Sequence, residues 1–87
     1  MRIRIRYFFH LTRPLSVKNP TEIQAFGIHL RKIREDRNLS QQQLADMANI
    51  AKTSLQRMEL GRQAGTIDVL VSIAKALNIS VSELVKF

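Results

Sequence analysis

Residues 38–61 constrain the fold of this 87-residue chain more than any other segment. Ser40 and Gln43 stand at the spacing of a capping box, which predicts that a helix begins there. Asn49 predicts a turn after that helix, because asparagine tolerates a left-handed backbone better than most residues. A second short helix is expected over about 51–60, and the glycine that follows it is the expected stop. The segment therefore predicts two short helices joined by a tight turn.

Helical spacing of apolar residues predicts another helix before this pair. Thr21 is its expected cap, with Gln24 completing a capping box, and Asn38 is its expected end. Its buried stripe recurs at three- and four-residue steps and comprises Ile23, Phe26, Leu30 and Ile33. Its more polar side carries Arg31, Lys32, Arg34 and Arg37.

Two further helices are expected after the pair. Thr66 begins the first, whose inward side chains are expected to be Ile67, Leu70, Ile73, Ala74 and Leu77. Ser80 and Glu83 form a capping box for a short final helix that carries Val81, Leu84 and Val85. In the central pair, the expected core contacts are Leu44, Ala45, Ala48, Ile50, Leu55 and Met58. The fold class is therefore all-α, with one five-helix domain over 21–87 and a separate arm over 1–20.

Composition limits the classes of function. The chain has no cysteine, which excludes disulfides and thiolate metal sites and suits a reducing cytosol. No apolar run approaches the roughly 20 residues that a membrane span needs. His10 and His29 stand far apart with no carboxylate cluster beside them, and no nucleophile–base pair or glycine-rich phosphate loop is visible. We therefore expect no enzymatic activity, no metal and no cofactor.

Charge is unevenly distributed along the chain. The net charge is +7 and the pI about 10.9, which favours an anionic partner, most commonly nucleic acid. Residues 1–20 hold five basic side chains and no acidic one, whereas residues 21–87 hold nine basic and seven acidic ones. Most of the excess positive charge therefore belongs to the arm.

Three interpretations of the arm stay open. Its arginines could contact DNA electrostatically from a disordered segment. Alternatively, residues 2–9 alternate with period two, as a strand does, and such a strand would need a second copy to pair with. The third interpretation is a frayed or mis-started tail.

Four segments together resemble the Cro/cI-type (XRE-type) helix-turn-helix domain of phage repressors and many bacterial regulators. They are LRKIRE at 30–35, LSQQQLA at 39–45, SLQRMELG at 54–61 and IAKALNISVSEL at 73–84. The resemblance implies a compact, lambda-repressor-like, five-helix domain whose third helix enters the major groove of DNA.

The resemblance also implies a set of DNA-binding residues. Positions that match the family's base-edge or nearby phosphate contacts are Lys52, Thr53, Gln56 and Arg57. Gln41 matches a phosphate donor at the start of the second helix, and Arg62 matches a further phosphate contact. Arg34 and Glu59 match a pair that forms a salt bridge beneath the motif.

Three departures from the family pattern affect this interface. Ala51 stands where Ser or Thr often caps the recognition helix, a cap worth about 1 kcal/mol. Leu60 replaces a polar residue near the DNA backbone, and Ala64-Gly65 replaces Asn-Pro. These changes affect phosphate contacts and leave the expected fold intact.

The functional hypothesis is a sequence-specific regulator that binds double-stranded DNA as a homodimer and represses by occluding a palindromic operator. Its expected dimer contacts are Val81, Leu84, Val85 and Phe87. The expected location is the bacterial cytoplasm, whether the protein is encoded by the bacterium or by a phage. When bound to DNA the protein is expected on the nucleoid, and no membrane contact is expected. The alternative is an antitoxin that chiefly binds a toxin protein and represses its own gene through the same motif.

Overall fold

The computed structural model describes residues 17–87, which form five α-helices and no strand. The helices are α2 (Pro20–Asp36), α3 (Gln41–Ala48), α4 (Lys52–Glu59), α5 (Ile67–Leu77) and α6 (Val81–Leu84). The all-α, five-helix prediction is therefore confirmed for this part of the chain. The interpretations of the arm concern residues that lie largely outside the described ones.

Local capping signals set most of the helix boundaries. Ser40 accepts a hydrogen bond from the backbone of Gln43 while the Gln43 side chain accepts from the backbone of Ser40, so the predicted capping box is present. Thr66 caps α5 through the backbone of Val69, at 3.2 Å. The capping box expected at the start of α6 is also present.

The turn and the stop of the central pair are also as predicted. Asn49 adopts the left-handed backbone, with φ of 56°. Gly61 follows α4 with φ of 73°, where a side chain would be strained and would also approach Gln24 within 2.6 Å. Asn49 thus ends α3 and opens the turn that leads into α4, and Gly61 turns the chain away after α4.

The first helix begins differently from the prediction. It starts at Pro20, and Asn19 is the cap residue but makes no side-chain capping bond. Proline is favoured in the first turn because its φ is already helical and its missing N–H would be unpaired there. The predicted capping box at Thr21 and Gln24 is therefore wrong, because Thr21 already lies within the first turn.

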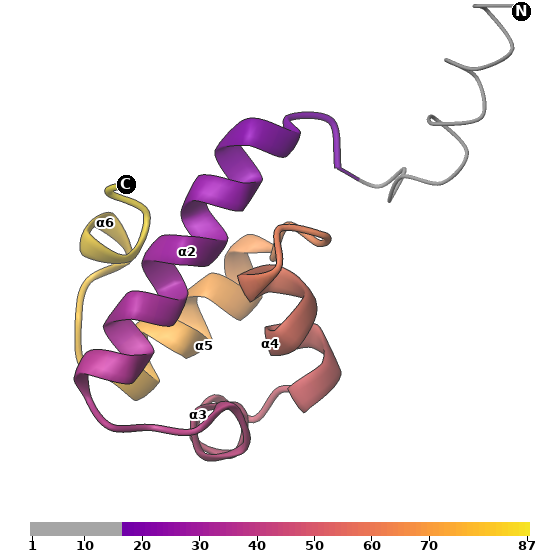
Figure 1. Ribbon diagram of the computed structural model, residues 1–87. Coiled ribbons are helices and arrows are strands. Elements are labelled where there is room, and N and C mark those ends of the chain that lie inside the picture. Colours follow the sequence, from indigo (N-terminus) through magenta and orange to yellow (C-terminus); the bar gives the residue numbers. More distant parts are fainter. Residues whose placement is uncertain (1–16) are drawn as a thin grey trace, which may run out of the picture.

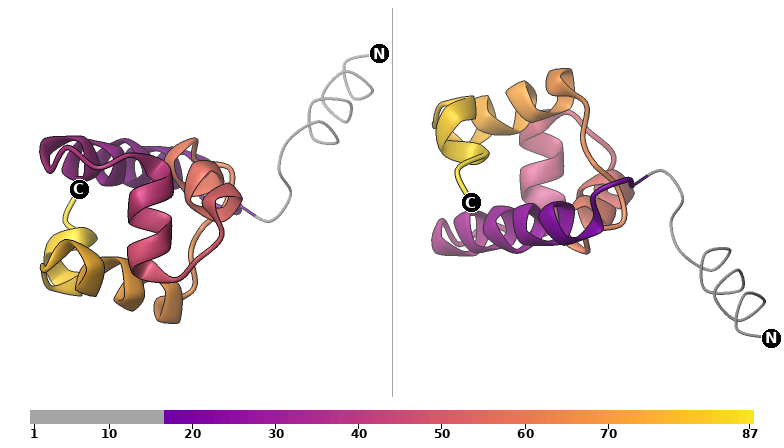
Figure 2. Two further views of the ribbon diagram at one scale, coloured as in Figure 1. Left: turned by 90° about the horizontal axis from the view of Figure 1, so that it is seen from below. Right: turned by 90° about the horizontal axis from the view of Figure 1, so that it is seen from above.

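The core lies where α3 crosses between two groups of helices. Figure 2 shows α2 on one side of α3, with α5 and α6 on the other. Its fully buried large side chains come from every helix and are Leu30, Leu44, Leu55, Met58, Ile73 and Leu84. Small Ala45 and Ala48 of α3 are buried among them, which allows the close crossing.

Two burial predictions fail. Ile67 was expected in the core but is 71% exposed, because it is the first residue of α5 and no other element covers it. Arg34 was expected on the polar side of the first helix but is only 8% exposed. Its burial is explained by the ion pair described below.

Candidate nucleic-acid interface

A buried ion pair joins α2 to the end of α4. Arg34 Nε donates to Glu59 Oε2 at 2.7 Å, and Arg34 Nη2 donates to Glu59 Oε1 at 3.0 Å. The third nitrogen, Nη1, donates to the carbonyl of Leu39 at 2.7 Å. Every nitrogen of the guanidinium therefore has an acceptor, as a buried arginine requires. The pairing that the family resemblance implied is present.

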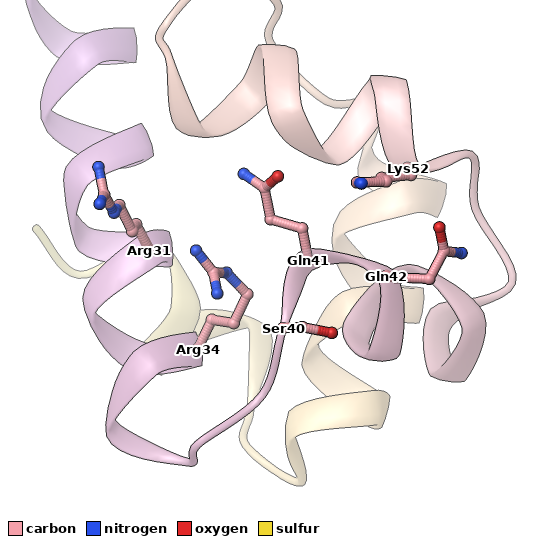
Figure 3. A pocket seen from close by; sticks show the side chains of 6 residues that line it. All are labelled: Arg31, Arg34, Ser40, Gln41, Gln42 and Lys52. Atoms are coloured by element: carbon pink, nitrogen blue, oxygen red, sulfur yellow. The ribbon is translucent and has the colours of Figure 1, made fainter.

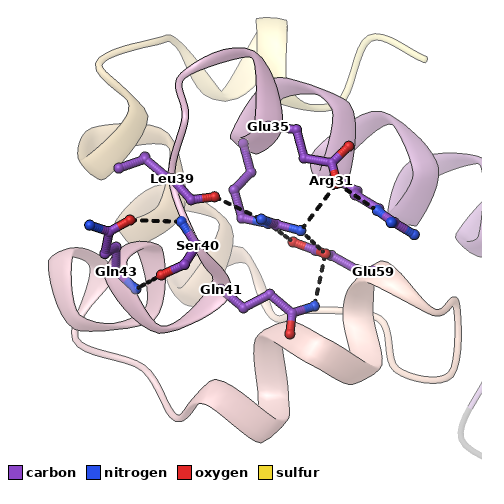
Figure 4. A network of polar contacts seen from close by, with 8 residues as sticks. Arg31, Glu35, Leu39, Ser40, Gln41, Gln43 and Glu59 are labelled. Atoms are coloured by element: carbon purple, nitrogen blue, oxygen red, sulfur yellow. Dashed lines mark hydrogen bonds and ion pairs between the residues drawn. The ribbon is translucent and has the colours of Figure 1, made fainter.

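Gln41 is tied to the same carboxylate. Its Nε2 donates to Glu59 Oε1 at 3.0 Å, so the network reaches the first residue of α3 (Figure 4). Because a carboxylate only accepts hydrogen bonds, the amide of Gln41 must turn its nitrogen toward Glu59. One N–H and the amide oxygen of Gln41 remain for other partners. Sequence reasoning missed this contact.

The hydrogen bonds from Arg34 to Glu59 are the largest influence on the pKa of Arg34 and raise it. Burial acts in the opposite direction, and the charges of Glu59 and Glu35 add to the increase. A raised pKa of a cation adds stability that is present below the unfolded-state pKa and is lost only as the pH rises through the folded-state value. The pair therefore contributes in full at neutral pH.

Gly27 lets α2 come close enough to make this pair. It is buried, and a Cβ at this position would lie 2.6 Å from the carbonyl oxygen of Glu59 and would also clash with that of Met58. Only a residue without a side chain allows the two backbones to approach in this way. The end of α4 is thus held against α2 by close backbone packing and by the ion pair.

The outer face of α4 is polar and exposed. Leu55, Met58 and Glu59 face inward and are buried. The structure places the predicted base-contacting residues on the opposite side, where all four are exposed: Lys52, Thr53, Gln56 and Arg57. Ala51, the cap residue, makes no side-chain capping bond, so the backbone N–H groups of Lys52 and Thr53 remain available.

A shallow pocket of about 500 Å³ lies beside the start of α4 (Figure 3). Its lining comes from α2, from the N-terminal cap and first turn of α3, and from the first residue of α4. The lining residues are Arg31, Arg34, Ser40, Gln41, Gln42 and Lys52. The pocket thus brings Gln41 and Lys52 together. Sequence reasoning did not assign Arg31 to the site. The available signal was its three-residue spacing from Arg34, which places both side chains on neighbouring parts of α2.

Two residues at or just after the C-terminal end of α4 are exposed. Arg62 is exposed just past the glycine stop, and Leu60 is 54% exposed at the C-terminal cap of α4. Neither lines the pocket. Arg62 is therefore accessible to a ligand but is not part of the Gln41–Lys52 cluster.

The predicted dimer contacts need one correction. Leu84 is fully buried in the core of its own domain, so it has no surface to offer a second copy. Val85 and Phe87 are 40% and 56% exposed, and Val81 is half-buried. Phe87 rests with its ring centroid 5.7 Å from that of Phe26, which places the C-terminal residue against α2.

Two short helices joined by a left-handed asparagine, with the second helix polar and exposed, define a helix-turn-helix domain. The sequence model of the helix-turn-helix family matches residues 30–84, more than half of the chain. The chain belongs to the Cro/cI-type (XRE-type) helix-turn-helix family.

Several characterised proteins are similar to it. The immunity repressor protein of Bacillus phage phi105 is 37% identical over 68% of this chain and 41% of its own length. The competence pilus inhibition repressor of Acinetobacter baylyi is 36% identical over 67% of this chain and 53% of its own length. The control protein C.SmaI of Serratia marcescens is 38% identical over 64% of this chain and 67% of its own length. The matched segment thus spans about half the length of the first two relatives.

Two solved structures agree with the fold. The restriction-modification controller protein C.AhdI of Aeromonas hydrophila superposes with a TM-score of 0.72 at 28% identity, covering 74% of this chain and 97% of that one. The clp gene regulator ClgR of Corynebacterium glutamicum gives a TM-score of 0.68 at 28% identity, covering 72% and 67%.

Two other kinds of feature are absent from the part of the chain that the structure describes. Within residues 17–87, no helix has both the length and the apolar character that crossing a membrane demands. The same residues contain no group of three or more His, Cys, Asp or Glu side chains placed to hold a metal ion.

Proposed function

We propose that this protein binds double-stranded DNA in a sequence-specific way and represses transcription. The observation that carries the proposal is the outer face of α4. It presents Lys52, Thr53, Gln56 and Arg57 to solvent on a short helix whose other face is anchored in the core. A helix of this kind fits the major groove, where lysine and arginine address guanine, glutamine addresses adenine, and threonine contacts the methyl group of thymine.

Contacts with the DNA backbone would hold α4 in register with the base pairs. Gln41 is the first residue of α3, where the helix dipole favours anions, and its second N–H is free to donate to a phosphate. Arg62 is exposed after α4 and is the second proposed phosphate contact. These contacts position the protein, whereas the side chains of α4 select the sequence.

We propose that two copies bind a palindromic operator. One module of this size covers less surface than tight specific binding needs, and two would place their recognition helices roughly 34 Å apart. The exposed apolar side chains near the C-terminus, Val85 and Phe87, together with half-buried Val81, are the proposed dimer contacts. Repression would follow from occlusion of a promoter.

The similar proteins support regulation of this kind. Two of them carry the name repressor and a third is a control protein. A DNA-bound regulator in a bacterium would reside in the cytoplasm, on the nucleoid, and we propose that location here.

The test begins with selection of bound DNA from a random pool, followed by gel shifts with the selected operator. Arg57→Ala should weaken operator binding by about 1–3 kcal/mol and relax base preference at one position. Lys75→Ala removes the same charge from an exposed position on α5 and is the matched control. Operator affinity that is equal in Arg57→Ala, Lys52→Ala and the control would refute base reading by α4 and favour the protein-binding alternative.

A further inference from the structure

Three cationic side chains line the pocket beside the start of α4, and they differ in the hydrogen bonds and ion pairs that they already make (Figure 3). Arg34 is held by Glu59 and Leu39 through all three of its nitrogens, and its side chain is only 9% exposed, so it presents little surface to a ligand. Arg31 pairs through its Nε alone with Glu35 Oε2 at 3.1 Å. Lys52 has no carboxylate within ion-pair distance in residues 17–87. Arg31 and Lys52 are therefore the cations of the pocket that can still bind an anion.

We propose that Arg31 binds a DNA backbone phosphate in this pocket, with Gln41 and Lys52, and that Glu35 competes with the phosphate for Arg31. This inference rests on the proposed function, because that function supplies the phosphodiester. It adds a phosphate-binding arginine on α2 and an acidic side chain that limits affinity.

The exposure of the Arg31–Glu35 pair makes the exchange feasible. The side chains of Arg31 and Glu35 are 61% and 53% exposed, and they lie one helical turn apart. Exposed pairs of this kind are weak, because both charges stay hydrated and the side chains must be ordered. A phosphate offers arginine two oxygens in a fork geometry and forms shorter, charge-assisted hydrogen bonds. The terminal nitrogens of Arg31 make no hydrogen bond within residues 17–87, so they remain available to it.

The held amide of Gln41 fixes where such a phosphate would lie. The Gln41 side chain stands between the arginines of α2 and Lys52 of α4 (Figure 3). Its hydrogen bond to Glu59 orders it before any ligand arrives. A phosphate that accepts from Gln41 is therefore placed between Arg31 and Lys52, which lie on opposite sides of the pocket.

The experiment compares four variants of the full chain on the selected operator and on random DNA. Arg31→Ala should lower affinity about fivefold on both DNAs and reduce the salt slope by about 0.9, the effect of one lost phosphate contact. Lys32→Ala removes an exposed charge from the neighbouring position, which is outside the pocket, and should change affinity less than Arg31→Ala does. Glu35→Gln should raise affinity about twofold.

The double variant Arg31→Ala with Glu35→Gln separates competition from general repulsion. If Glu35 acts through Arg31, its substitution has no effect once Arg31 is alanine. If Glu35→Gln raises affinity equally in both backgrounds, the carboxylate only repels DNA and the competition is refuted. Equal losses in Arg31→Ala and Lys32→Ala would refute the phosphate contact of Arg31.

A second measurement distinguishes failure of this inference from failure of the proposed function. Inorganic phosphate is titrated into the free protein while the Nε–H resonance of Arg31 is followed by NMR. A shift that saturates, and that is lost in Gln41→Ala, supports the pocket even if gel shifts show no DNA binding. An Arg31 resonance that does not respond, in a protein whose Arg57→Ala variant loses operator binding, overturns the inference and leaves the proposed function standing.

Discussion

Removing Glu59 should cost this domain a large share of its stability. In Glu59→Ala, Arg34 keeps its hydrogen bond to Leu39 and a longer contact, 3.9 Å, with the exposed carboxylate of Glu35, and Gln41 loses its acceptor as well. The Arg34 side chain is 9% exposed, so its charge would stay largely out of water. Breaking a buried pair by deleting one partner costs about 3–5 kcal/mol, because the remaining charge is uncompensated.

That cost is large beside the total stability of a domain this small. Native domains are stable by about 0.05–0.15 kcal/mol per residue, which is roughly 4–13 kcal/mol for a chain of this length. Each kcal/mol corresponds to about 4–8 °C in Tm at this size, so Glu59→Ala should melt at least about 12 °C lower than the wild type. Urea unfolding followed by far-UV circular dichroism measures the free energy directly.

The double variant Arg34→Met with Glu59→Leu tests whether the uncompensated charge is the cause. It removes both charges and fills similar volume, so it should be more stable than Glu59→Ala and more stable than Arg34→Met alone. A Glu59→Ala variant that loses less than about 1 kcal/mol, or a double variant no more stable than the singles, would refute this reasoning.

Three other substitutions test separate steps of the argument. Gly27→Ala should destabilise the domain by more than 1 kcal/mol, since its Cβ would meet the backbone of Met58 and Glu59, and a thermal melt measures this. Ala51→Ser should add about 1 kcal/mol in urea unfolding, because α4 has no side-chain cap at present. Ile67→Ser should change stability by less than about 0.5 kcal/mol, since Ile67 is exposed; a core-sized loss would contradict that placement.

Features decided within a few residues could be predicted from the sequence. The capping box of Ser40 and Gln43, the left-handed Asn49 and the stop at Gly61 are confirmed, because each depends on backbone hydrogen bonds or sterics inside one turn. Where two local signals competed, the prediction failed. Pro20 started the first helix ahead of Thr21, because proline needs no capping partner for its missing N–H.

Features that depend on how the helices pack against one another could not be predicted in the same way. Helical periodicity placed Ile67 and Ala74, seven residues apart, on the same face, but Ala74 is buried and Ile67 is exposed. Periodicity also could not show that Leu84 would be buried within its own domain rather than free to contact a second copy. The hydrogen bond between Gln41 and Glu59 joins residues 18 apart on different helices, so no local pattern indicates it.

The ion pairs change how the charge of the domain should be counted. Residues 21–87 carry nine basic side chains, yet Arg34 is neutralised by Glu59 and Arg31 is paired with Glu35. The unpaired cations of the proposed interface on and after α4 are then Lys52, Arg57 and Arg62. Even if all three contacted phosphate and Arg31 exchanged Glu35 for a fourth, the salt slope would be only about −3.6, so a single copy should hold DNA weakly at physiological salt. Tight binding therefore requires cations from elsewhere, either a second copy or the five basic residues of 1–20. A salt slope near −3.6 that persists in the full-length protein on its operator would show that neither source contributes.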